Sequence, residues 1–249
     1  MKQFFVVMLC LALVACTTQA PAPQAQPPPQ VQAPAAEPVA QIPTQQEQPA
    51  PVVSAPQKIT IPQILSDLLA KRSSVKSIQY DYTATDEAQQ YAVWIRGTKV
   101  KIGAATAQTL SHEGQFFSHV YFDTASHTVK ALCDSPNLCS QTTEKGSFTV
   151  PYDEYYRKTP LDWALALEQG LYSPIESDAS EVLIDNRITE VFRYDEGNKK
   201  TRFYIDKFYG VPLKVETVSD DPAGSKRKFV LYKNAAFNSL IEADVTPKA

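Results

Sequence analysis

Residues 201–216 read TRFYIDKFYGVPLKVE and contain two alternating runs joined by a short turn. In the first run Phe203 and Ile205 alternate with polar neighbours, and the second run alternates in the same way. A period of two is typical of strands that bury one face and expose the other. Gly210 ends the turn and can adopt the positive φ that a tight connection needs. The stretch therefore predicts an antiparallel hairpin inside a larger sheet.

The N-terminus has the features of an export signal. A short apolar run, residues 4–14, follows Met1-Lys2. The run is too short for a membrane-spanning helix but has the length of the apolar part of a signal peptide. It ends in Leu13-Val14-Ala15-Cys16, which resembles the lipobox of bacterial lipoproteins. An ordinary secretory signal, cut near Ala20, is the alternative.

The lipobox resemblance implies a membrane anchor. Residues 1–15 would be the signal peptide, and Cys16 would become the acylated N-terminus of the mature chain. Two or three acyl chains hold a protein on a membrane far more firmly than one. Thr17, rather than Asp, follows the cysteine, which by the sorting pattern of Gram-negative bacteria implies the periplasmic face of the outer membrane.

Residues 16–57 form the second segment, a tether that follows the lipidated cysteine. It consists almost wholly of Pro, Ala and Gln, has no aromatic residue, and carries charge only at Glu37 and Glu47. Such a composition cannot bury enough apolar surface to offset the entropy lost on folding. We therefore expect a disordered spacer, with the folded domain in residues 58–249.

The folded domain combines many alternating runs with few helical ones. Residues 61–69 carry an apolar stripe at helical spacing, with Thr60 as the expected cap. Thr159 and Pro160 predict the start of a second helix, and Gly170 its end. Between and after them we expect nine to eleven strands in one antiparallel sheet, including a strand over residues 116–122. This is an α+β fold.

Cys133 and Cys139 lie in the exported domain, where disulfides persist. The turn-forming residues between them favour closure of a small ring. Zinc is the alternative, with His112, His119 or His127 completing a site. The spacing matches no common zinc motif, so we predict a disulfide and no metal.

Two stretches resemble the lipoprotein-carrier superfamily that includes LolA, LolB and RseB. Residues 93–102 (VWIRGTKVKI) are similar to its strand-turn-strand pattern, and residues 204–215 are similar to a second pattern, with Tyr209 where threonine is commoner. The resemblance covers about residues 58–245. It implies a strongly curved antiparallel sheet, an open half-barrel, with two or three helices on its concave side over an apolar cavity for acyl chains.

The side chains that would face this cavity are assigned from alternation alone. They are Tyr80, Tyr82, Tyr91, Val93, Ile95, Val100, Ile102, Phe203, Ile205 and Val215. A ligand would be held there by apolar burial, without chemistry. The alternative is that the same positions form a filled core.

The expected function is that of an outer-membrane lipoprotein that binds a lipid or the acyl chains of a lipoprotein. The alternative is an RseB-like sensor or scaffold that binds another envelope protein, with residues 152–156 as the candidate surface. The sequence holds no phosphate loop, G-x-S-x-G or H-E-x-x-H motif, so we expect no enzyme and no cofactor. A net charge of −3 gives no basic footprint for nucleic acid.

Overall fold

The computed structural model describes residues 61–105, 109–134, 139, 146–221 and 224–247. All of them belong to the compact unit Ser54–Ala249. The predicted signal peptide, Cys16 and the tether lie outside the described residues and stay predictions. Within the described ranges, every helix is too short or too polar to cross a bilayer.

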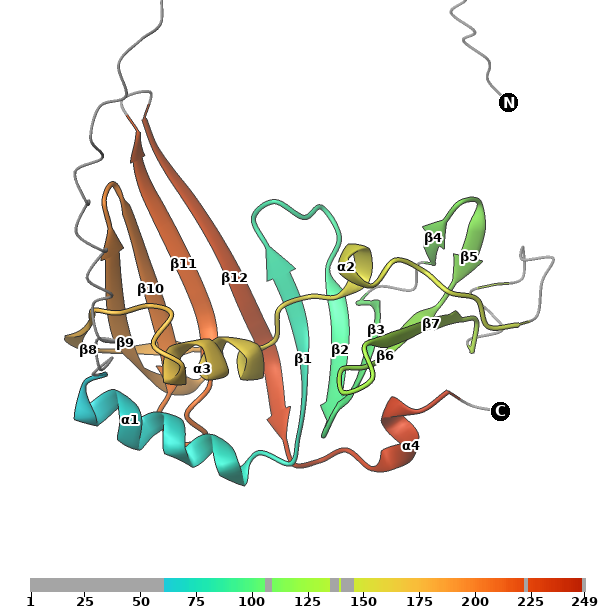
Figure 1. The fold of residues 1–249 in the computed structure, drawn as a ribbon, viewed down its shortest axis with the longest axis horizontal. Helices are drawn as coiled ribbons and strands as arrows, with labels where there is room; N and C mark the ends of the chain where they lie inside the picture. Colours follow the sequence, from blue (N-terminus) through green and yellow to red (C-terminus); the bar gives the residue numbers. More distant parts are fainter. Residues whose placement is uncertain (1–60, 106–108, 135–138, 140–145, 222–223, 248–249) are drawn as a thin grey trace, which may run out of the picture. The chain divides into compact units, whose positions relative to one another are not determined.

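The chain has strands in two groups, with short helices before, between and after them (Figure 1). The helices are α1 (Gln63–Ala70), the 3-10 helix η1 (Lys71–Ser74), α2 (Tyr152–Tyr155), α3 (Pro160–Glu168) and α4 (Glu242–Val245). The first group of strands is β1 (Ser77–Ala84), β2 (Tyr91–Arg96), β3 (Lys99–Ala104), β4 (Leu110–His112), β5 (Gln115–Phe117), β6 (His119–Asp123) and β7 (Thr128–Leu132). The second is β8 (Ile175–Ile184), β9 (Arg187–Glu196), β10 (Lys199–Asp206), β11 (Pro212–Asp221) and β12 (Gly224–Phe237).

Ten strands form one antiparallel sheet in the order β7-β6-β3-β2-β1-β12-β11-β10-β9-β8, and β4 pairs with β5 separately. Each group is a meander of neighbouring strands, and the β1–β12 pair joins the two meanders. The predicted α+β fold with a large antiparallel sheet is confirmed. The sheet is open, because β7 and β8 are its outermost strands.

The strand expected over residues 116–122 is wrong. Instead, Gln115–Phe117 pairs with β4, and His119–Asp123 joins the large sheet between β3 and β7. Ser118 separates the two strands, and its backbone N–H donates to the carbonyl of Leu132 at 3.0 Å. The apolar run continues across both strands, so hydropathy alone does not show where the chain changes partner.

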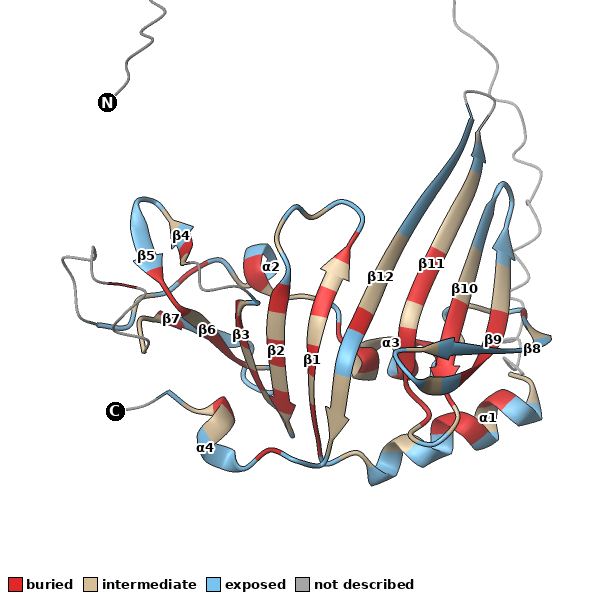
Figure 2. Cartoon of the chain, turned by 180° about the vertical axis from the view of Figure 1, so that it is seen from behind, coloured by how far each residue is buried: buried red, intermediate tan, exposed pale blue. Residues whose placement is uncertain are grey.

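α2 and α3 lie on one face of the sheet, which we call the covered face (Figures 1 and 2). Two clusters of buried side chains pack on this face: the first lies mainly on the first meander and includes Tyr232 of β12, and the second joins α1 and α3 to strands β8 to β11. Leu161 and Trp163 of α3 and Phe237 of β12 pack against both clusters. The helix α3 therefore connects the cores of the two meanders.

The start of α3 follows its sequence signals closely. Thr159 accepts a hydrogen bond from the backbone of Asp162, Asp162 accepts one from the backbone of Thr159, and Pro160 occupies the first turn. The start of α1 differs, because Pro62 is in the cap position and provides no side-chain hydrogen bond. Thr60, the predicted cap, lies outside the described residues.

The turn after β10 brings the backbone against α1. Gly210 has a φ of +66°, and a Cβ at this position would lie 1.9 Å from the carbonyl oxygen of Leu68. The side chain of Asp206 accepts hydrogen bonds from the backbone N–H groups of Phe208 and Tyr209 and so shapes the turn. Only glycine allows this approach, which lets α1 bury Leu65, Leu68 and Leu69 in the second cluster.

We expect Gly210→Ala to lower the free energy of unfolding by roughly 2–4 kcal/mol, because α1 must move away from the turn. Urea denaturation followed by far-UV circular dichroism measures the change. Gly197→Ala is the matched control, since Gly197 has a similar φ of +59° with nothing within 4 Å of its Cβ position. It should lose only about 1 kcal/mol from backbone strain. Equal losses in the two variants would contradict the contact.

Candidate binding site

The ten side chains predicted to face a cavity are all buried on the covered face. Seven of them, from Tyr80 to Ile102, belong to the first cluster. Phe203, Ile205 and Val215 belong to the second. The structure thus brings the predicted residues together as two groups, joined through α3.

Aromatic side chains of β12 and α3 pack against the first group. Tyr232 is fully buried, and its ring centroid lies 5.0 Å from that of Tyr80 and 6.0 Å from that of Tyr82. Its hydroxyl donates to the carbonyl of Lys158 at 2.7 Å and accepts from the indole N–H of Trp163 at 2.9 Å. The segment that leads into α3 is therefore fixed onto the sheet above the predicted cavity.

One hydroxyl inside this cluster has no hydrogen-bond partner in the described residues. Tyr80 is 3% exposed, and its hydroxyl oxygen is both buried and unpaired. Burial raises the pKa of Tyr80 well above its ordinary value, and the nearby Tyr232 and Tyr156 raise it further. Because buried polar groups usually have partners, a polar atom from outside the chain would suit this position.

The tyrosines of residues 152–156 contact the chain rather than forming a free surface. Tyr152 stacks on His127 with 4.0 Å between ring centroids, and Tyr156 stacks on Tyr152 at 5.0 Å. Tyr155 is buried and donates a hydrogen bond to the carbonyl of Ser111 at 2.7 Å. These rings attach α2 to the β6–β7 hairpin and to the β4–β5 pair.

An open groove lies where β1 begins and β2 ends. Its volume is about 590 Å³, and its apolar lining comes from Val75, Ile95 and Leu161. A second groove of about 380 Å³ shares Val75 and Leu161 with the first and continues along α1 and η1. One of the ten predicted residues, Ile95, therefore lines an open site. The other apolar lining residues, Val75 and Leu161, come from segments far from Ile95 in the sequence, so no local motif could have identified the groove.

The rim of the first groove is mainly basic. Lys76, Arg96 and Lys99 line it together with one carboxylate, that of Glu242. The Glu242 carboxylate lies 2.5 Å from the ammonium of Lys99 and 3.6 Å from Nε of Arg96. Three cations against one anion leave this groove positive in a chain whose net charge is −3. A partner that is apolar and acidic fits it best.

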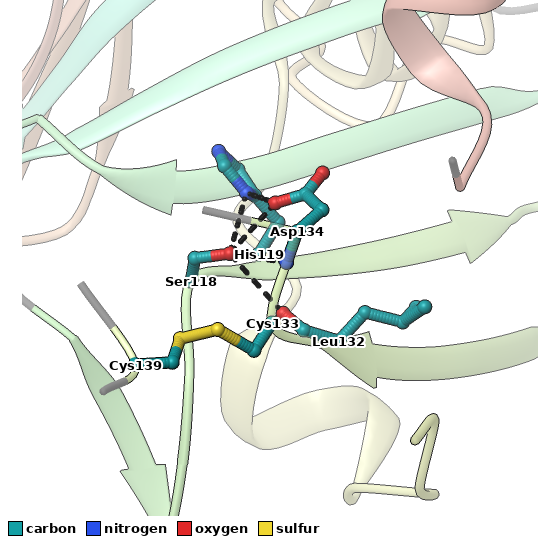
Figure 3. Close-up of a disulfide and its surroundings, with 6 residues drawn as sticks. All are labelled: Ser118, His119, Leu132, Cys133, Asp134 and Cys139. Atoms are coloured by element: carbon teal, nitrogen blue, oxygen red, sulfur yellow. Dashed lines mark hydrogen bonds and ion pairs between the residues drawn. A yellow bond between two sulfur atoms is a disulfide. The ribbon is translucent and has the colours of Figure 1, made fainter. Parts of the chain in front are cut away.

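A buried polar cluster surrounds Asp134, next to the predicted disulfide, which the structure contains between Cys133 and Cys139 (Figure 3). Asp134 accepts hydrogen bonds from Ser118 at 2.7 Å and from His119 and Tyr121. Sequence reasoning missed the cluster, because Asp134 lies some fifteen residues from its partners. Asp134 directly follows Cys133 in the sequence, and that adjacency to the predicted disulfide was the available signal.

The Ser118–His119–Asp134 set does not have the geometry of a catalytic triad. Ser118 and Asp134 both contact Nδ1 of His119. A triad needs the carboxylate on one ring nitrogen and the nucleophile on the other. The set instead holds the strand of His119 against the segment that begins at Cys133.

No family model and no curated protein matches the sequence. Among solved structures, the crystal structure of MucB in complex with MucA(peri) matches with a TM-score of 0.42 and 12% sequence identity. The match covers 74% of this chain and 60% of that chain, so this chain spans about 60% of the length of the matched protein. Membership of the lipoprotein-carrier superfamily stays a prediction from the sequence.

We expect Asp134→Asn to remove an acid-sensitive part of the stability. Burial raises the pKa of Asp134, but hydrogen bonds from His119, Tyr121 and Ser118 outweigh it and hold the pKa well below its ordinary value. A carboxylate with a lowered folded-state pKa stabilises the fold above its unfolded pKa of about 4, and that contribution is lost as the pH falls below it. At pH 7 the variant should lose roughly 1.5–3 kcal/mol.

Urea denaturation at pH 7, 4, 3 and 2 measures this effect. The difference between wild type and Asp134→Asn should shrink steadily below pH 4. Asp86→Asn is the control, because Asp86 forms an exposed ion pair with Lys228 and should change little at any pH. A difference that stays constant down to pH 2 would contradict a charged, hydrogen-bonded Asp134.

Proposed function

We propose that this chain is a lipid-anchored, non-catalytic binding protein of the bacterial cell envelope, and that its folded domain holds a segment of a partner envelope protein. The observation that carries the proposal is the groove bounded by Val75, Ile95 and Leu161. It is open, whereas the nine predicted cavity residues other than Ile95 are buried among the chain's own side chains.

The groove has the anatomy of a peptide-binding site. An apolar floor supplies contact area, and charged side chains at the rim set the orientation of what binds. Leu161 lies in the first turn of α3, which the capping box fixes, and Gly97, with a φ of +57°, lies in the β2–β3 turn; both line the groove. A capped helix start and a tight hairpin therefore both line the groove, so little ordering is needed when a partner binds.

Two further features support the envelope location. The predicted lipobox would place Cys16 in a membrane, and residues 16–57 would let the domain reach a partner away from that membrane. The Cys133–Cys139 disulfide is of the kind that persists in exported proteins.

Photo-crosslinking in the native cells tests the proposal. A photoreactive amino acid at Thr98, an exposed residue that lines the groove, should give a covalent adduct with a second polypeptide, identified by mass spectrometry. The control is the same amino acid at Lys226, which is exposed near the opposite end of β12 and should give none. Absence of a protein adduct at Thr98, or equal adducts at both positions, would contradict the proposal.

Binding of an acyl chain is the second candidate function, and the unpaired hydroxyl of Tyr80 favours it. A lipid whose polar atom reached Tyr80 would satisfy that hydroxyl and lie among the apolar side chains of the first cluster. Native mass spectrometry of the purified chain should then show a bound lipid that Tyr80→Phe binds less tightly. A lipid-free protein would leave the groove as the binding site.

A further inference from the structure

The C-terminal segment after β12 runs along the rim of the groove. We call residues 239–247 the strap (Figure 1). Asn238 fixes its start, because its side-chain oxygen accepts hydrogen bonds from the backbone N–H groups of Lys76 at 2.6 Å and Ser77 at 3.3 Å. Leu240 and Val245 are buried and hold the strap against the sheet. Both ends of the strap are therefore fixed to the folded domain.

Between these two anchors, Glu242 faces the cationic rim. Its carboxylate pairs with Arg96 and Lys99, and Arg96 also donates to the carbonyl of Leu240 at 2.7 Å. The side chain of Glu242 is 58% exposed, and those of Arg96 and Lys99 are each 39% exposed. Exposed ion pairs of this kind contribute little to stability. A carboxylate of the partner that displaced Glu242 would therefore lose a factor of about five or less in affinity.

We propose that Glu242 occupies the position that an acidic side chain of the partner protein takes when the partner binds. In this proposal, which rests on the proposed function, the partner segment places a carboxylate on Arg96 and Lys99 and an apolar side chain on Val75, Ile95 and Leu161. The strap then lowers the affinity for every partner, because a partner carboxylate must displace Glu242 from Arg96 and Lys99.

The charge at the rim supports an acidic partner rather than a neutral one. Lys76 also lines the groove, and within the described residues its side chain forms no ion pair. Two cations are paired with one carboxylate, and a third lies close by. A segment with one or two acidic residues would neutralise this excess. The apolar lining is formed by three side chains, which suits a peptide better than a long acyl chain.

A peptide titration tests the proposal. The probe is a fluorescein-labelled peptide with the sequence of residues 238–245 (NSLIEADV), which combines apolar side chains with two carboxylates, those of its Glu and its Asp. Fluorescence anisotropy compares full-length chains that all carry Cys16→Ser, so that no acyl group competes. Glu242→Gln should bind the peptide about two- to five-fold more tightly than the chain with Glu242, and 0.5 M salt should reduce the gain.

Three controls make the result decisive. Adding Lys99→Gln to Glu242→Gln should abolish the gain, and a peptide with Gln in place of its Glu and Asn in place of its Asp should show none. Equal affinity of the two chains, or no binding by Glu242→Gln with an unchanged unfolding midpoint, would overturn the proposal. A gain for dihexanoyl phosphatidylglycerol below its micelle concentration, without a gain for the peptide, would overturn it in favour of a lipid headgroup.

Failure of this proposal is distinguishable from failure of the proposed function. A protein adduct at Thr98 with no effect of Glu242→Gln would leave the groove as a binding site and remove only the role of Glu242. No adduct at Thr98 would overturn the proposed function whatever the peptide does.

Discussion

The close contact between Gly210 and the backbone of Leu68 determines where α1 lies. A side chain at position 210 would overlap the Leu68 carbonyl, so the absence of a Cβ allows α1 to bury its apolar stripe on β10 and β11. η1 continues directly from α1 and delivers Val75 and Lys76 to the start of β1. The part of the groove lining that Val75 and Lys76 form therefore depends on a single glycine, Gly210, more than a hundred residues away in the sequence.

The second dependence is the bridge made by α3. Its capping box fixes the first turn, and from that turn Leu161 and Trp163 reach both clusters of buried side chains. Trp163 also donates to Tyr232, which lies against Tyr80 and Tyr82. The same helix thus places Leu161 and Trp163 against both clusters, and Leu161 also lines the open groove. Because α3 packs against both clusters, it covers one face of the sheet and also borders the groove that stays open at the ends of the strands.

Much of the fold could be predicted from the sequence, because the signals concerned are local. Alternation identified most of the strands, and Thr159 with Pro160 identified α3. The split at Ser118 could not be predicted, because it depends on pairing with β4 rather than on hydropathy. The groove could not be predicted either, since Val75, Leu161 and Glu242 meet only after the two meanders have joined through β1 and β12. The ten side chains that alternation assigned to the cavity are all buried, but alternation cannot tell a filled interior from a vacant one.

The central claim is that the covered face is filled by the chain's own side chains. Val93→Phe tests it directly, because Val93 is 1% exposed at the centre of the first cluster. If the interior is filled, the larger side chain should lower the free energy of unfolding by about 1–3 kcal/mol in urea denaturation. Val182→Phe, at an exposed position on β8, should change it by less than about 0.5 kcal/mol. Unchanged stability of Val93→Phe would mean that the interior has room for a guest, and would contradict a filled face.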